Sequence, residues 1–306
     1  KVLQSGVAVA AIPPVAPKRR QSPTGQKAAA ATLAAAEPLP AGRVMPVAFR
    51  GGAVGAATLR RVLCYGDSLT VGFCANGQVY EPYGRMLAKD LAASATGVEC
   101  EVLVSGHSGL TAAEMVAYMD NKKVQDVASR HGKGLRRILR EESKPELALI
   151  MAGTNDLGKG RQPAEIFKDI CRLHAECHAL GVRTVVLSPP AAPFAKSSSS
   201  WDVSRRRLKE LLTSWAQSTP FVAALVDPSE LVPPAAAGAW DPDRLHFSPA
   251  GSKLLGRRLA PLVLPLLFAK PAPAGAASEE IRVAKVIHPA GSQDRPAAGL
   301  NLVALP

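Results

Sequence analysis

Three side chains that are far apart in the sequence have the types needed to activate a hydroxyl group for attack on a carbonyl carbon. Ser68 stands directly after the apolar residues 62–65 and the turn-forming pair Gly66-Asp67. His246 follows Asp243 by three residues, so a single turn can bring the carboxylate to the far nitrogen of the imidazole. A serine hydroxyl is a weak nucleophile unless a neighbouring base removes its proton. We therefore expect acyl-transfer chemistry with Ser68 as the nucleophile, His246 as the general base and Asp243 as the group that orients the base.

Acyl transfer also requires hydrogen-bond donors for the negative oxygen of the tetrahedral intermediate. The candidates are the backbone N–H groups of Ser68 and Gly106 and the side-chain amide of Asn155. A glycine at 106 permits a tight turn and leaves its N–H unshielded. These donors form the predicted oxyanion hole.

Two further residues compete for the roles of base and orienting group. Asp241 is a second carboxylate that could orient His246, but it is two residues more distant from the histidine than Asp243 is. We therefore rank it second. His107 is a second histidine beside the predicted oxyanion hole, but the sequence offers it no neighbouring carboxylate, so we expect it to line the pocket wall. Trp240 either lines an acyl pocket or covers the core, and its position in the sequence does not distinguish the two.

These residues must be positioned by an alternation of strands and helices that starts at residue 61. Strands are expected over 61–66, 99–105, 146–152, 182–188 and 221–227, and helices over 81–93, 111–120, 133–142, 163–180, 202–216 and 248–268. Such alternation predicts an α/β fold with a parallel sheet that has helices on both faces. Loops after the strands of such a sheet converge on one edge, where ligands bind. The segments that hold Ser68, Gly106, Asn155 and His246 should therefore meet there.

Four segments, in order, resemble the four sequence blocks of the SGNH (GDSL) hydrolase superfamily. They are Gly66-Asp67-Ser68-Leu69, Gly106, Gly153-Thr154-Asn155-Asp156 and Asp243-Arg244-Leu245-His246. The strings Tyr65-Gly66-Asp67-Ser68-Leu69-Thr70, Leu187-Ser188-Pro189-Pro190 and Leu245-His246-Phe247 look closest to the bacterial arylesterase/acyltransferase branch. The serine is not in a Gly-x-Ser-x-Gly elbow, so the α/β-hydrolase fold is disfavoured.

The resemblance extends over roughly residues 61–268 and implies both a fold and a set of roles. It implies a three-layer α/β/α, flavodoxin-like parallel sheet and no metal or cofactor. It also implies that Ser68 is the nucleophile, that Asp243 and His246 complete the triad, and that Gly106 and Asn155 belong to the oxyanion hole.

The two ends of the chain differ in composition from the hydrolase domain expected over 58–270. Residues 1–57 and 271–306 are rich in Pro and Ala, and residues 1–60 hold eight Lys or Arg against one acidic residue in a chain of net charge +12. We expect the basic leader to be disordered in isolation. It resembles an organelle-targeting leader, for a plastid or a mitochondrion. The alternative is a linker or a docking tail for a protein partner. If the leader is not a targeting signal, we expect the protein in the cytoplasm. The sequence does not begin with Met, which indicates a fragment or a processed form.

Other classes of protein are disfavoured by composition. The basic residues are not interleaved with aromatic residues, which argues against a nucleic-acid partner. No apolar stretch reaches the roughly 18 residues that a membrane helix needs, so no transmembrane segment is expected.

The cysteines and histidines also need an interpretation. The five cysteines have no framework spacing, and Cys64 and Cys100 lie in apolar runs, so we expect buried hydrophobic residues. Residues 171–178 hold the one metal-like cluster, formed by Cys171, His174, Cys177 and His178. Because three soft ligands on one helix rarely close a metal site, we expect a partly buried helix face there.

Two functional hypotheses follow from these observations. The first is a serine esterase that cleaves small carboxylic esters through an acyl-enzyme, with acyl transfer to alcohols as a further activity. The second is a structural or accessory subunit of a larger assembly, whose long tails dock on neighbours and whose catalysis is secondary or lost. Every triad position of the resembling family is occupied by the expected residue type, which favours the esterase hypothesis. The loops at 73–80 and 191–200, whose shapes the sequence does not specify, should set acyl and alcohol specificity.

Overall fold

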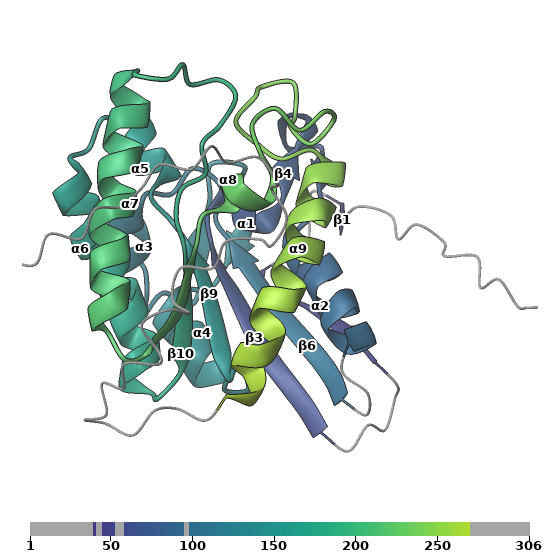
Figure 1. Cartoon of the computed structure of the whole chain (residues 1–306). Coiled ribbons are helices and arrows are strands. Elements are labelled where there is room, and N and C mark those ends of the chain that lie inside the picture. The colour runs from purple at the N-terminus through teal and green to yellow at the C-terminus, as the bar shows by residue number, and fades with distance from the viewer. Residues whose placement is uncertain (1–38, 41–44, 53–57, 95–97, 270–306) are drawn as a thin grey trace, which may run out of the picture. The chain divides into compact units, whose positions relative to one another are not determined.

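A six-stranded sheet forms the centre of the computed structural model, which describes residues 39–40, 45–52, 58–94 and 98–269 (Figure 1). The strand order is β11-β10-β9-β3-β6-β2. The strands are β2 (Val47–Gly51), β3 (Thr58–Gly66), β6 (Val98–Gly106), β9 (Leu147–Met151), β10 (Arg183–Leu187) and β11 (Val222–Val226). All neighbouring strands run parallel except β2, which pairs antiparallel with β6 at the edge. The carboxyl ends of the parallel strands therefore meet at one edge of the sheet.

Helices cover both faces of the sheet, so the fold is a three-layer α/β/α arrangement. One face is covered by α2 (Tyr83–Ser94) and α9 (Pro249–Phe268), which pack against each other, and the other by α3 (Ala112–Ala117), α4 (Leu135–Glu141), α6 (Pro163–Ala179) and α7 (Ser200–Ser218) (Figure 1). Every residue of β9 is buried, as expected for a central parallel strand with helices on both sides. This confirms the predicted fold class.

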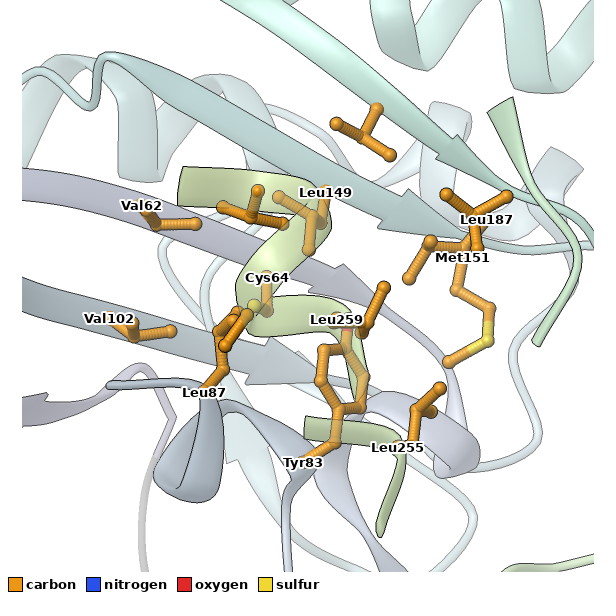
Figure 2. Close-up of a cluster of buried hydrophobic side chains, with 14 of the residues drawn as sticks. Val62, Cys64, Tyr83, Leu87, Val102, Leu149, Met151, Leu187, Leu255 and Leu259 are labelled. Atoms are coloured by element: carbon orange, nitrogen blue, oxygen red, sulfur yellow. The ribbon is translucent and has the colours of Figure 1, made fainter. Parts of the chain in front are cut away.

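Two hydrophobic clusters, one on each face, hold the layers together. In the first, Tyr83 and Leu87 of α2 and Leu255 and Leu259 of α9 lie against sheet residues that include Val62, Cys64, Val102 and Leu149 (Figure 2). Burying a side chain of leucine size contributes roughly 1.5–3 kcal/mol. Clusters of this size make the sheet a rigid base for the loops at its edge.

Local signals account for several helix boundaries. Helix α3 begins with a capping box, in which Thr111 and Glu114 each accept a hydrogen bond from the backbone N–H of the other. Helix α6 begins at Pro163 and α9 at Pro249, as expected for prolines in a first turn.

Shorter elements complete the description. They are α1 (Ser68–Val71), α5 (Thr154–Gly158), α8 (Pro228–Leu231), the 3₁₀ turn η1 (Ala75–Gly77), and the strands β1 (Leu39–Pro40), β4 (Phe73–Cys74), β5 (Val79–Tyr80), β7 (Val124–Gln125) and β8 (His131–Gly132). Strands β1, β5 and β4 form a small antiparallel sheet, and β7 pairs with β8.

The sheet begins earlier in the chain than residue 58, the first residue expected for the hydrolase domain. Strand β2 pairs with β6 from Val47 to Gly51, so a segment expected to belong to the disordered leader is part of the sheet. The reason is that β2 is a short edge strand, whose stability comes from its pairing with β6 and from the burial of Val47 against Met45, Val71 and Tyr80. Of the expected leader over 1–57, the structure describes only residues 39–40 and 45–52. The tail over 271–306 lies outside the described residues. Among the helices that are described, none has the length and apolar character that a membrane span requires.

Candidate active site

Ser68 lies at the carboxyl end of β3, where the chain turns sharply into the short helix α1. Asp67 caps this helix, because its Oδ1 accepts a hydrogen bond from the backbone N–H of Leu69 at 3.0 Å. Gly66 is required at the turn, since a Cβ there would lie 2.1 Å from the backbone oxygen of Met151. The Ser68 side chain is therefore held on a turn that has little freedom, and the residue is only 6% exposed.

His246 and Asp243 reach Ser68 from a loop 178 positions later in the chain. The Nε2 atom of His246 lies 2.9 Å from the Ser68 hydroxyl oxygen, and Nδ1 lies 2.6 Å from Oδ2 of Asp243. With the proton on Nδ1 donated to Asp243, Nε2 accepts from the Ser68 hydroxyl. The structure thus brings the three predicted triad residues into one line of hydrogen bonds.

Asp243 is held in the orientation that this contact needs. Its other oxygen, Oδ1, accepts hydrogen bonds from the backbone N–H groups of Leu245 at 2.9 Å and His246 at 3.0 Å. Partial burial raises the pKa of Asp243, but the hydrogen bonds from the His246 ring and from the two N–H groups outweigh burial and hold the pKa below its ordinary value. The carboxylate is therefore ionised at neutral pH and can stabilise a protonated imidazole.

The loop that carries both residues is closed at its base. The backbone N–H of Asp241 donates to the carbonyl of His246 at 2.8 Å, and Trp240 forms a β-bridge with Phe247. Within the same loop, the carbonyl of Arg244 accepts a hydrogen bond from the backbone N–H of Phe194 at 3.1 Å. The loop over 191–200 is thus joined directly to the loop that carries His246.

The two oxyanion-hole candidates outside α1 lie at the end of β6 and in α5, which follows the neighbouring strand β9. Gly106 ends β6 opposite Gly66, and a Cβ at 106 would lie 2.5 Å from the backbone nitrogen of Val71. This close approach of β6 to α1 explains the glycine. Asn155 stands in the first turn of α5, and its Nδ2 donates to the carbonyl of Leu110 at 2.9 Å. An amide NH₂ group has two donors, so this bond orients the side chain and leaves one donor for an oxyanion.

The prediction that His107 lines the pocket wall is wrong. His107 is 1% exposed, its Nε2 donates to the carbonyl of Lys133 at 3.2 Å, and its ring packs edge-on against Tyr65. Burial lowers its pKa to about 4. His107 is a core residue, because the chain after Gly106 turns the side chain into the protein.

The two alternatives around Trp240 and Asp241 are also decided by the structure. Trp240 covers the core, since it packs on Phe247 at a ring distance of 4.7 Å and its Nε1 donates to the carbonyl of Pro233. The carboxylate of Asp241 accepts from the backbone N–H of Ala75, and the imidazole is bonded to Asp243.

The cysteine and histidine cluster on α6 is a buried helix face. His174 is fully buried against Trp215, and burial lowers its pKa to about 3, while Nε2 of His178 lies 2.9 Å from Oγ1 of Thr184. In the part of the chain that the structure describes, no group of three or more His, Cys, Asp or Glu side chains could hold a metal ion.

Two features of the site were missed in the sequence. The ring of Phe73 lies 4.7 Å from the ring of His246, and burial raises the pKa of Asp67, next to Ser68, to about 7. The only available signal for Phe73 was its place shortly after Ser68. No local pattern reports that its ring reaches a histidine so distant in sequence.

Comparisons with known proteins identify the family and the fold. The model of the GDSL-like Lipase/Acylhydrolase family matches residues 64–254. The fold is similar to that of a carbohydrate acetylesterase family member from Sinorhizobium meliloti, with 22% identity and a TM-score of 0.52 over 69% of this chain and 100% of that chain. It is also similar to that of an aryl esterase from M. smegmatis, with 23% identity and a TM-score of 0.50 over 68% of this chain and 99% of that chain.

A third solved structure, TesA, shares 23% identity with a TM-score of 0.52 over 68% of this chain and 99% of that chain. No curated protein sequence matches this chain. At these identities, the likeness to solved structures shows a shared fold.

Proposed function

This chain belongs to the GDSL-like lipase/acylhydrolase family, and we propose that it is a serine esterase that cleaves small carboxylic esters through an acyl-enzyme. The observation that carries the proposal is the line of hydrogen bonds from Asp243 through His246 to Ser68, at 2.6 and 2.9 Å. A hydroxyl, a base and an orienting carboxylate in this order are what acyl transfer by serine requires.

Each residue has a defined step in the proposed reaction. The Ser68 oxygen attacks the ester carbonyl carbon while His246 takes the hydroxyl proton, and Asp243 stabilises the imidazolium that forms. The backbone N–H groups of Ser68 and Gly106 and the amide of Asn155 donate to the oxyanion. The C–O bond to the alcohol then breaks, and His246 returns the proton to the leaving oxygen. Water activated by His246 attacks the acyl-Ser68 ester and releases the acid.

An alcohol that replaces water in the second step would make the reaction an acyl transfer. The resemblance of three sequence strings to the arylesterase/acyltransferase branch supports this as a further activity. The names of the similar structures, an acetylesterase and an aryl esterase, make acetyl and aryl esters the first substrates to test.

Covalent labelling tests the proposed function directly. We expect a fluorophosphonate probe to modify the folded chain at Ser68, because the probe reports a hydroxyl activated by its neighbouring base. The modified residue is identified by mass spectrometry of the digested protein, with heat-denatured protein as the control. A folded chain that takes no label would contradict the esterase and favour a purely structural role.

The pH dependence of kcat/KM should show a loss of activity on the acid side. His246 acts as a base only when its imidazole is neutral, so protonation of the imidazole removes the reactive form and the rate should fall as the pH is lowered. The lowered pKa of Asp243 keeps this carboxylate ionised over the same range. The measurement is ester hydrolysis under kcat/KM conditions between pH 4 and pH 9.

Asp67, next to Ser68, is a second group whose ionisation could shape this profile, because burial raises its pKa to about 7. Asp67→Asn removes the titration and keeps an oxygen that can cap α1. We expect the acid limb to stay at the same pH in this variant. A limb that disappears with Asp67→Asn would assign the ionisation to Asp67 and refute the assignment to His246.

A further inference from the structure

Asp241 joins two loops that meet at the catalytic edge of the sheet. Its Oδ2 accepts a hydrogen bond from the backbone N–H of Ala75 at 3.1 Å, across 166 positions of sequence. Its own backbone N–H donates to the carbonyl of His246 at 2.8 Å. The residue is only 9% exposed. One buried residue thus connects the segment 73–77, through its side chain, to the main chain of the proposed catalytic base, through its backbone N–H.

The segment 73–77 has a conformation that needs such a connection. Ala75, Asn76 and Gly77 follow one another with φ values of 49°, 53° and 79°. Alanine rarely adopts the left-handed region, because its Cβ approaches the following carbonyl oxygen. The Asp241 carboxylate accepts the N–H of the first of these residues and so stabilises the turn between β4 and β5.

Phe73, at the start of this turn, contacts the imidazole of His246. The two ring centroids are 4.7 Å apart with an angle of 45° between the planes, and Phe73 also packs edge-on against Tyr80. Hydrogen bonds to Asp243 and Ser68 fix the positions of the two imidazole nitrogens. They do not prevent the imidazole ring from rotating about the axis that runs from Asp243 to Ser68. The Phe73 ring, tilted against the imidazole in close contact, restricts this rotation.

We propose that Asp241 is a positioning residue for the serine–histidine pair. By fixing the turn at Ala75 it places Phe73 against the His246 ring, which keeps Nε2 within reach of the Ser68 hydroxyl. This inference rests on the proposed esterase function. It assigns to Asp241 a role as a hydrogen-bond acceptor for the backbone and not as an electrostatic partner of the imidazole.

The Asp241→Asn and Asp241→Ala variants separate these roles. Asparagine keeps an oxygen that can accept from Ala75 but loses the charge, and alanine loses both. We expect Asp241→Ala to lower kcat for p-nitrophenyl acetate on the order of 10- to 100-fold with little change in KM, since small misplacements of a catalytic group cost rates of this size. Asp241→Asn should restore most of the loss. Circular dichroism and thermal unfolding establish that each variant is folded.

The Phe73→Ala variant is a second test, because it removes the ring that contacts His246 and keeps the hydrogen bond between Asp241 and Ala75. It should lower kcat by a similar factor, and the double variant with Asp241→Ala should lose no more than about the larger single loss, because both changes act through one contact. An Asp241→Asn variant as slow as Asp241→Ala would overturn the inference by assigning the effect to charge. Wild-type kcat in Asp241→Ala or in Phe73→Ala would also overturn it.

The same assays distinguish failure of this inference from failure of the proposed function. Full activity in Asp241→Ala beside an inactive Ser68→Ala would overturn the positioning role and leave the esterase intact. A folded wild-type chain with no hydrolysis and no labelling at Ser68 would overturn both.

Discussion

Replacing Ser68 with alanine is expected to abolish ester hydrolysis, with a loss of kcat on the order of 10⁶-fold. The reason is that the variant has no oxygen with which to form the acyl-enzyme, so that only binding and oxyanion stabilisation remain. The side chain is small and almost buried, and its removal leaves the cap of α1 by Asp67 unchanged, so the fold should be retained. The measurement is the initial rate with p-nitrophenyl acetate, together with thermal unfolding.

A matched serine variant shows whether the loss is specific. Ser218 lies at the end of α7, where its hydroxyl donates to the helix carbonyls of Ser214 and Trp215. Ser218→Ala removes the same atom from an exposed helix end and should keep the wild-type rate. Equal rates for Ser68→Ala and wild type, in folded protein, would refute the nucleophile and with it the proposed mechanism.

Replacing His246 with alanine should cause a loss nearly as large. Without the imidazole, the Ser68 hydroxyl keeps its proton at neutral pH and the leaving alcohol receives none. Because the two residues act as one unit, the double variant with Ser68→Ala should be no slower than Ser68→Ala alone. The measurement is kcat for the two single variants and the double variant with the same ester.

Added imidazole gives a sharper test of the role of His246. The free base can enter the space that the side chain vacates and should restore part of the activity of His246→Ala, but none of the activity of Ser68→Ala. His131→Ala, on the short strand β8, is a control that removes a different, partly exposed histidine. Residual activity near that of the wild type in His246→Ala would show that another group is the base.

Contiguous patterns in the sequence predicted the main elements of the fold well. The apolar run predicted as a strand over 146–152 forms β9 from Leu147 to Met151, and the helix predicted over 163–180 forms α6 from Pro163 to Ala179. The helix predicted over 111–120 forms the shorter α3 from Ala112 to Ala117, with Thr111 as its N-cap. These signals succeed because their causes are local: side-chain period, first-turn prolines and caps involve residues within a few positions of one another.

Elements that depend on distant partners were not predicted. Strand β2 exists through its pairing with β6, about 50 positions later, and the turn at Ala75 is held by Asp241. Neither segment has a length or period that would stabilise it alone. A short edge strand and a left-handed turn therefore leave no clear trace in the local sequence.

The alternation of strands and helices follows from local patterns in the chain, and so do the residue types of a serine triad, which occur in the order of the family. The sequence ranked Asp243 ahead of Asp241 as the partner of His246, and the structure has that contact. The sequence did not place His107 in the core or show that Phe73 contacts the imidazole. Those facts are distances between residues up to 178 positions apart. They were decided by the tertiary structure, because strand order, strand register and the packing of the helices bring the loops together at one edge of the sheet.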